Sequence, residues 1–371
     1  MRVALMSGAN AIHTTRWANG LAAAGADVHL LSAHPLRHHL DERVHMHELP
    51  FRAPWGYLLN VPAVRRMLAS IQPDLVNAHY ASGYGTLARL CGFRPLLLSV
   101  WGSDVYDFPR KSSSHRRLVA ANIRAADAIG STSHCMARET MAVQTHGQVH
   151  ITPFGVDERL FYPFEVPGRP KDELVIGTVK TLAPKYGVDT LIEAFAMAWV
   201  RLGRPNELVL EISGDGPQRS ELEALALRLG VSDRVRFYGR IPHERVPEML
   251  NRLDIYVALS RDESFGVAIL EASACAKPVL VSDADGPVEV TVDGKTGLIV
   301  ARNDPGAAAE ALVRLIEDPA MRARMGAAGR SHVIEHYTWD DSVRQMLAVY
   351  EAVIARHGTG TAEQGGKGAT A

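Results

Sequence analysis

The sequence is poor in cysteine and has no long hydrophobic run. Its three cysteines, Cys91, Cys135 and Cys275, are odd in number and scattered, so neither a disulfide framework nor a zinc site is indicated. No apolar stretch approaches the roughly 18 residues of a membrane span. The N-terminus also lacks the apolar core of a signal peptide. We therefore expect a cytoplasmic protein in a reducing compartment.

The chain also lacks an excess of charge of one sign. Its 371 residues include 40 Lys and Arg and 41 Asp and Glu, a net charge of -1. Because nonspecific binding of nucleic acids needs many uncompensated cations, we expect no nucleic-acid partner. A chain of this length, with 47% hydrophobic residues, is expected to form two domains that each bury a core.

Short apolar segments of strand length alternate with helical segments and turns. In the first half this pattern predicts strands at 3–6, 28–32, 74–78, 96–100, 128–131 and 150–153. It stops in a proline-rich linker near 160–174 and then restarts, with strands predicted at 174–179, 208–213, 235–238 and 255–258. Such alternation is typical of parallel sheets with helices on both faces.

We therefore predict an α/β protein of two doubly wound, Rossmann-like domains, over residues 1–165 and 166–338. A last helix is expected over 339–357, and the Gly/Ala/Thr-rich tail over 358–371 is expected to be disordered. Doubly wound domains bind ligands at the carboxyl ends of their strands, so we expect a site in the cleft between the two domains. Its residues should follow strands directly.

The most informative stretch is Ser260–Ala274, which follows a strand and begins a helix near Gly266. The backbone N–H groups of Phe265, Gly266 and Val267 would be unpaired at the start of that helix. Unpaired amides at a helix N-terminus form a ready site for an anion such as a phosphate. The glycine would let the phosphate approach the backbone closely.

Charged residues surround this predicted anion site. Glu263 and Glu271 are eight positions apart, roughly 12 Å along a helix, a separation that suits the two sugars of a nucleoside-diphosphate sugar. Lys180 and Lys185 follow the first strand of the second half and could neutralise the diphosphate without a metal. On spacing alone, the alternative is that Glu263 is an acid at the helix start that complements the helix dipole and that the other three are solvated charges.

At this point the sequence resembles a known family. The stretch from Asp262 through Glu271 is similar to the E-x7-E motif of retaining glycosyltransferases of family 4, which have the GT-B fold. That fold has two Rossmann-like domains facing across a cleft and a C-terminal helix that returns to the N-terminal domain. Other family-like segments follow in order: 155–157, 177–185, 213–217, 237–241, 286–289 and 293–297.

The resemblance implies roles for the matching residues. Glu263 would hold hydroxyls of the donor sugar, Glu271 would hold the ribose, and Lys180 and Lys185 would bind the diphosphate. The other donor-binding residues that it implies are Phe265, Gly266, Val267, Arg240, Ile241 and Gly8. It also implies front-face attack, in which the departing diphosphate oxygen helps to deprotonate the acceptor, with no cofactor and no bound metal.

The first half departs more from the family pattern. Five residues that follow predicted strands are the candidates for the acceptor side: His13, Arg16, His79, Trp101 and Asp104. Trp101 stands where relatives usually carry histidine, so we expect a stacking surface for a sugar there. A buried core tryptophan is the alternative, and ordinary hydrogen-bonded loop residues are the alternative for the histidines.

The first half is also the basic half, since residues 1–165 hold 16 Lys and Arg against 12 Asp and Glu. Aromatic and basic residues occur together in 51–66 and in 109–117, as on surfaces that bind anionic lipid. We therefore expect peripheral docking on the membrane and an acceptor saccharide linked to a polyprenyl diphosphate. The alternative is ordinary solvated charge.

The function that we expect is transfer of a hexose or N-acetylhexosamine, most readily from a UDP-sugar, in cell-surface polysaccharide synthesis. One alternative keeps the fold but uses a soluble sugar phosphate or small metabolite as acceptor. Another is a noncatalytic module that binds nucleotide sugars. A dinucleotide-dependent dehydrogenase is disfavoured, because neither glycine loop, at 8–13 or at 214–219, has the G-x-G-x-x-G spacing.

Overall fold

The computed structural model describes residues 1–365. It contains two α/β units, one formed by Met1–Pro153 with the segment from Asp340 onward, the other by Phe154–Trp339. The first unit thus ends at Pro153 rather than at residue 165. The reason is that the following segment bonds within the second unit, where the Val156 N–H donates to the Tyr337 carbonyl at 2.8 Å.

The first unit is a parallel sheet of seven strands in the order β3-β2-β1-β4-β5-β6-β7. The strands are β1 (Arg2–Met6), β2 (Asp27–Ser32), β3 (Val44–Glu48), β4 (Leu75–His79), β5 (Leu96–Val100), β6 (Ala128–Ser131) and β7 (Val149–Ile151). Its helices are α1 (Ile12–Ala23), α2 (Gly56–Leu59), α3 (Val61–Ile71), α4 (Gly83–Cys91), α5 (Ser113–Ala125) and α6 (His134–Val143). The pattern did not predict β3, because this edge strand has three polar residues in five.

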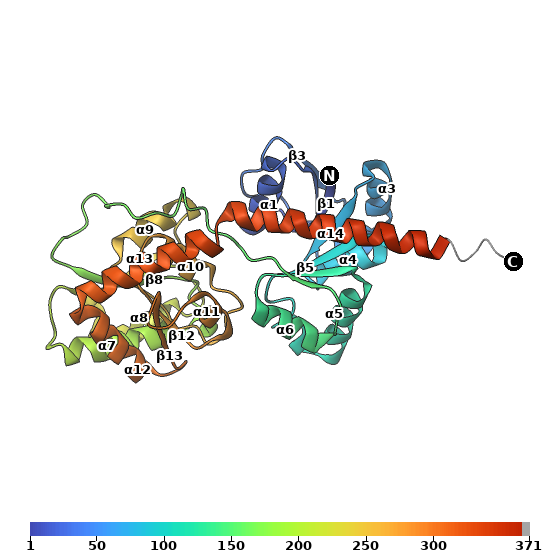
Figure 1. Ribbon diagram of the computed structural model, residues 1–371. Coiled ribbons are helices and arrows are strands. Elements are labelled where there is room, and N and C mark those ends of the chain that lie inside the picture. The colour runs from blue at the N-terminus through green and yellow to red at the C-terminus, as the bar shows by residue number, and fades with distance from the viewer. Residues whose placement is uncertain (366–371) are drawn as a thin grey trace. The chain divides into compact units, whose positions relative to one another are not determined.

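The long C-terminal helix α14 (Trp339–Gly365) belongs to the first unit from Asp340 onward (Figure 1). It buries a stripe of side chains there: Val343, Met346, Tyr350 and Val353. The predicted return of the last helix to the N-terminal domain is therefore confirmed. The helix continues past the expected end at 357 as far as Gly365, and residues 366–371 of the expected tail lie outside the described part of the chain.

The second unit is a parallel sheet of six strands in the order β10-β9-β8-β11-β12-β13. The strands are β8 (Leu174–Val179), β9 (Leu208–Ser213), β10 (Val235–Gly239), β11 (Ile255–Ala258), β12 (Val279–Ser282) and β13 (Gly297–Val300). Its helices are α7 (Val188–Arg201), α8 (Arg219–Arg228), α9 (Val246–Arg252), α10 (Val267–Ala274), α11 (Asp285–Val290), α12 (Pro305–Glu317) and α13 (Pro319–His336).

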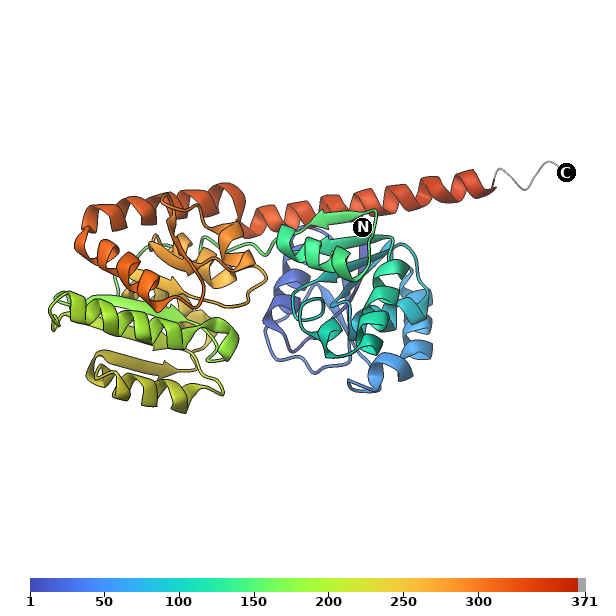
Figure 2. The ribbon, with the colours of Figure 1, turned by 90° about the horizontal axis from the view of Figure 1, so that it is seen from below.

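Each sheet lies between helices, as Figures 1 and 2 show for both units. In the second unit, apolar residues of α7, α8 and α12 share one core with alternate residues of the central strands, such as Ile176, Leu210 and Ile255. The central strands β8, β9, β11 and β12 are largely buried and mostly apolar, as in sheets covered on both faces. The prediction of two doubly wound α/β domains is confirmed.

Both sheets have the same switch point. In each unit the first three strands are added in one direction across the sheet. The fourth strand then pairs with the opposite edge of the first strand, so β1 adjoins β4 and β8 adjoins β11. Crevices at the carboxyl ends of strands at such a point are the usual ligand sites. Within residues 1–365, no helix combines the length and the apolar character that crossing a bilayer requires.

Candidate functional site

A buried ion pair forms at the switch point of the second unit. Lys180 follows β8 and Glu263 follows β11, and the Lys180 Nζ donates to Glu263 Oε1 although the residues are 83 positions apart. They meet because β8 and β11 pair in register, with Tyr256 opposite Gly177. The two charges that the sequence predicts at one site are thus brought together by the sheet order.

The pair is almost removed from water, since the Lys180 and Glu263 side chains are 8% and 11% exposed. Ser260 Oγ donates to the second carboxylate oxygen at 2.7 Å, so both oxygens of Glu263 have a partner. Burial disfavours the charged ammonium, but Glu263, together with Tyr256 and Tyr186, outweighs this effect, and the pKa of Lys180 is raised above its ordinary value. Lys180 therefore carries its charge throughout the physiological pH range.

Two close backbone contacts hold the loops that carry this pair. Gly214 has φ +143°, and a Cβ there would lie 1.8 Å from the Lys180 carbonyl oxygen. Gly187 has φ +61°, and a Cβ there would lie 1.9 Å from the Leu259 carbonyl oxygen. Only glycine fits both the dihedral angle and the approach. The glycines that the sequence places after strands therefore set the position of the Lys180 loop.

Lys180 and Lys185 both lie against the ring of Tyr186. The Lys180 and Lys185 Nζ atoms are 5.0 and 5.2 Å from the centre of the Tyr186 ring. The Lys185 side chain is exposed, and its backbone carbonyl accepts from the Arg261 N–H at 2.7 Å. One loop thus presents a buried and an exposed ammonium, and sequence reasoning missed Tyr186, the residue between them.

The start of α10 has the geometry that the sequence predicts. Gly266 is its N-cap, with φ +108°, and no side chain caps the helix. In the described part of the chain, the amides of Phe265, Gly266 and Val267 donate no hydrogen bond to another residue. These donors follow Glu263 directly, so an anion bound to them would lie beside the buried ion pair. Glu271, inside the helix, is 7% exposed.

Arg240 and Ile241 follow β10, with Arg240 exposed and Ile241 half-buried. The Gly239 carbonyl accepts from the Gly214 N–H at 2.8 Å, so this loop is attached to the one that packs on Lys180. The residues predicted for the donor in this unit therefore lie at the carboxyl ends of adjacent strands. Gly8, by contrast, lies in the first unit.

Gly8 lines a pocket of about 270 Å³ at the switch point of the first unit. The lining residues are Gly8, Asn10, Ala11, His34, Tyr57, Tyr80, Ser82, Gly83 and Tyr84. Most of them follow β1, β2 or β4 directly. The volume and the three tyrosine rings suit a small polar ligand with an apolar face, such as a sugar.

Sequence reasoning missed the three tyrosines of this pocket, although two of them stand just after a predicted strand. Tyr80 has φ +71°, a strained conformation that few non-glycine residues adopt. The Tyr84 hydroxyl lies 2.8 Å from His34 Nδ1 and accepts from the Ala33 N–H at 3.0 Å. Burial lowers the pKa of His34, which keeps this ring neutral near pH 7.

His79 is inside the unit rather than in the pocket. It is 1% exposed, and its Nε2 and Nδ1 lie 3.0 Å from Asn77 Oδ1 and Ser7 Oγ. The same Asn77 oxygen accepts from the Tyr350 hydroxyl of α14 at 2.9 Å. Burial lowers the pKa of His79 to about 3. This network connects β1, β4 and α14, so the structure gives His79 a position in the core.

Trp101 lies beside three of the other acceptor-side candidates, His13, His79 and Asp104. Its ring centre is 4.1 Å from that of His79 and 6.4 Å from that of His13, and Arg16 follows one turn later on α1. Asp104 is buried, and its carboxylate accepts from the Ala81, Trp101 and Gly102 amides at 2.7, 3.2 and 2.9 Å. Asp104 therefore shapes the loop that carries Trp101.

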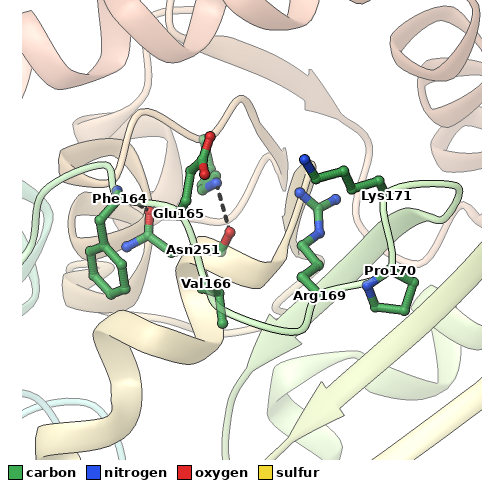
Figure 3. Close-up of a pocket in the computed structure, with 8 residues that line it drawn as sticks. Phe164, Glu165, Val166, Arg169, Pro170, Lys171 and Asn251 are labelled. Atoms are coloured by element: carbon green, nitrogen blue, oxygen red, sulfur yellow. Dashed lines mark hydrogen bonds between the residues drawn. The ribbon is translucent and has the colours of Figure 1, made fainter.

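A larger cavity, of about 460 Å³, lies elsewhere in the second unit (Figure 3). It is lined by Phe164, Glu165, Val166, Arg169, Pro170, Lys171, Asn251 and Lys277. Asp254, which pairs with Arg169, precedes β11, and Lys277 precedes β12, so this cavity is at the amino ends of the strands. It is thus separate from the Lys180–Glu263 pair.

Comparisons with known proteins show which family the chain resembles. Residues 163–332 match the family model described as "Glycosyl transferases group 1", and residues 2–133 match "Glycosyl transferase 4-like". A "GDP-mannose-dependent alpha-(1-6)-phosphatidylinositol monomannoside mannosyltransferase" of Mycolicibacterium smegmatis is 30% identical over 273 residues, 69% of each chain. A related "monoacylated" mannosyltransferase of Corynebacterium glutamicum is 33% identical over 225 residues, 56% of this chain and 58% of that protein.

The chain spans about half the length of several curated relatives that it matches, 58% of the Corynebacterium protein and 42% of another. In structure it resembles sucrose-phosphate synthase from Thermosynechococcus elongatus, with a TM-score of 0.83 at 23% identity over 96% of this chain and 100% of that one. This likeness concerns the fold.

Proposed function

Because the chain belongs to glycosyltransferase family 4 and has the GT-B fold, we propose that it transfers a hexose or N-acetylhexosamine from a nucleoside-diphosphate sugar to a hydroxyl group. The observation that carries the proposal is the buried Lys180–Glu263 pair beside the unpaired amides of α10. A fixed cation and preorganised donors stabilise the negative charge that develops on a departing diphosphate.

Seven residues of the donor side have a task in this proposal. Lys180 and Lys185 neutralise the diphosphate, and the amides of 265–267 bind a phosphate oxygen or a sugar hydroxyl. Glu263, held by Lys180 and Ser260, accepts hydrogen bonds from the transferred sugar, and Glu271 accepts them from the ribose. A carboxylate suits a diol because its two oxygens accept two hydrogen bonds at once.

We propose that the reaction retains the anomeric configuration. The bond from the anomeric carbon to the diphosphate oxygen breaks while the acceptor oxygen bonds to the same face of the sugar. The acceptor proton then passes to the departing diphosphate oxygen. Glu263 is paired with Lys180, which suits a binding role better than that of a free nucleophile. Proton NMR of the new glycosidic linkage tests this: an anomeric configuration opposite to that of the donor would refute it.

The donor is tested by thermal shift with UDP, GDP, ADP and their sugar conjugates, since a ligand that binds the native state raises Tm according to its affinity. We propose a uridine nucleotide. The two mannosyltransferases compared above are GDP-mannose-dependent by name, which makes GDP the competing donor. The shift should disappear in Glu271→Ala and persist in the control Glu335→Ala, whose side chain is 72% exposed. No shift with any nucleotide would contradict the proposed donor site.

For the acceptor we propose a saccharide bound in the 270 Å³ pocket of the first unit, with the rings of Tyr57, Tyr80 and Tyr84 against it. A polyprenyl-diphosphate-linked saccharide is our first choice and a soluble sugar phosphate or small metabolite the second. Transfer assays with lipid-linked and water-soluble acceptors separate the two. Donor binding without turnover on any acceptor would instead favour a noncatalytic binding module.

Docking on an anionic membrane is part of the lipid-linked proposal. Trp55 is 72% exposed, and Phe51, Leu58 and Leu59 near it are each about half exposed. Arg52 lies in the same segment. Flotation with anionic liposomes should carry the wild-type protein upward, and Trp55→Ser should weaken this. The control Leu227→Ser changes an equally exposed apolar residue, 69% exposed, in the second unit. A wild-type protein that stays wholly in the soluble fraction would contradict docking.

A further inference from the structure

Three histidines and an aspartate lie together on β2 and β3, the last two strands at one edge of the seven-stranded sheet. The two strands pair in parallel, with His29 opposite His45 and Leu31 opposite His47. Side chains of alternate residues on a strand share a face. Asp27 and His29 therefore face the same side as His45 and His47.

Three of these side chains bring possible ligand atoms close together. Asp27 Oδ1 is 3.3 Å from His29 Nε2 and 3.5 Å from His45 Nε2, and all three atoms lie within 4.8 Å of one another. Bonds of about 2.0–2.2 Å to a tetrahedral ion would separate neighbouring ligand atoms by roughly 3.3–3.5 Å. The separations of 3.3 and 3.5 Å match two edges of such a tetrahedron.

In Asp27 and His29, the polar atom that would not bind the metal has a hydrogen-bond partner of its own. Arg2 Nε donates to Asp27 Oδ2 at 2.6 Å, which leaves Oδ1 directed at the histidines. His29 Nδ1 lies 3.0 Å from His47 Nε2. When the Nδ1–H of His29 donates a hydrogen bond to His47, the proton of His29 is on Nδ1, and the lone pair of its Nε2 can bind a metal. Such supporting bonds are characteristic of metal sites, because they fix the tautomer and the orientation of each ligand.

We propose that Asp27, His29 and His45 bind one divalent transition-metal ion, for which Zn²⁺ is the best fit, with solvent as the fourth ligand. Two imidazoles and one carboxylate favour Zn²⁺, Co²⁺, Ni²⁺ or Cu²⁺ over Mg²⁺ or Ca²⁺, which prefer oxygen. The His45 side chain is 59% exposed, so the ion can enter from water.

The position of this site indicates a structural role. Asp27 is the first residue of β2, and the pocket residues Gly8 and His34 follow the carboxyl ends of β1 and β2. The metal site is thus toward the amino ends of the strands, away from the pocket. The ion would link β2 to β3, an edge strand that otherwise pairs on one side only. The inference does not depend on the proposed transferase activity.

The test uses the full chain without a histidine tag, stripped with a chelator and titrated with Zn²⁺ against a fluorescent competitor. We expect one equivalent bound per chain and a rise in Tm on saturation. His45→Gln should weaken binding by more than about 10-fold, and Asp27→Asn, which can still accept from Arg2, should do the same. Co²⁺ should give the intense visible absorption of a four-coordinate site, and Mg²⁺ should not compete.

Two further variants distinguish this site from weak binding by surface histidines. His47→Gln removes a supporting residue and should weaken binding by roughly 10- to 100-fold, whereas His38→Gln, an exposed histidine outside the cluster, should leave it unchanged. The proposal is overturned if no equivalent of Zn²⁺ binds, or if the folded His45→Gln and Asp27→Asn variants bind as tightly as wild type. An equal loss in His38→Gln would also overturn it.

Discussion

Lowering the pH should destabilise the protein through His79. In the folded state this ring is 1% exposed and bonded at both nitrogens, to Asn77 and Ser7, and burial lowers its pKa to about 3. In the unfolded chain the pKa of histidine is about 6.5. Between these two values the unfolded state binds a proton that the folded state does not, so the free energy of unfolding falls as the pH falls.

The size of the effect follows from the pKa of the unfolded state. At pH 5.0, about 1.5 pH units below that pKa, the unfolded state gains about 2 kcal/mol from protonation, since each unit corresponds to about 1.36 kcal/mol. Folded His79 gains almost nothing at this pH, because its pKa is well below 5. At pH 7.5 neither state is protonated to a significant extent, and the contribution vanishes.

The assay is urea unfolding of wild type and His79→Gln at pH 7.5 and at pH 5.0. A glutamine amide can still donate to Asn77 Oδ1 but does not titrate. Other groups contribute equally to both proteins, so wild type should lose about 2 kcal/mol more than the variant between the two pH values. If the two proteins lose the same free energy, His79 is protonated in the folded state and the reasoning is wrong.

Three further predictions concern single contacts. Lys180→Met should lower kcat by about 10²- to 10³-fold in a transfer assay, because a charge that stabilises the leaving diphosphate is lost; the exposed control Lys295→Met should keep full activity. Tyr350→Phe should lower the free energy of unfolding by about 1 kcal/mol, since Asn77 Oδ1 loses one donor; an unchanged urea midpoint would count against the bond. Gly266→Ala should lower Tm and reduce the nucleotide-induced shift, because alanine is strained at φ +108°; a full shift would show that this conformation is not needed.

Much of the fold could be predicted from sequence, because local patterns determine it. Apolar segments such as Leu208–Ser213 and Ile255–Ala258 are buried on both sides, and the structure has strands with those bounds. The edge strand Val44–Glu48 escaped prediction because it is short and three of its five residues are polar. The last helix continues to Gly365, beyond the buried stripe that packs on the first unit. The glycines after residue 357 had led us to expect disorder there.

The grouping of the residues that we propose for the donor was also predictable, because glycine, glutamate and lysine directly after parallel strands come together at one edge of the sheet. The sequence could not say that the Lys180 Nζ contacts Glu263 or that Ser260 supports the same carboxylate. These contacts depend on which strands are neighbours, and strand order is a long-range property.

By itself, the sequence determined the two parallel α/β units, the helix start at Gly266 and the residue types of the donor side, since each rests on interactions within a few residues. Only the tertiary structure decided that His79 and Asp104 are buried, that three tyrosines line the pocket of the first unit, and that Asp27 meets His45. Burial and proximity arise from the packing of distant segments, which no local pattern encodes.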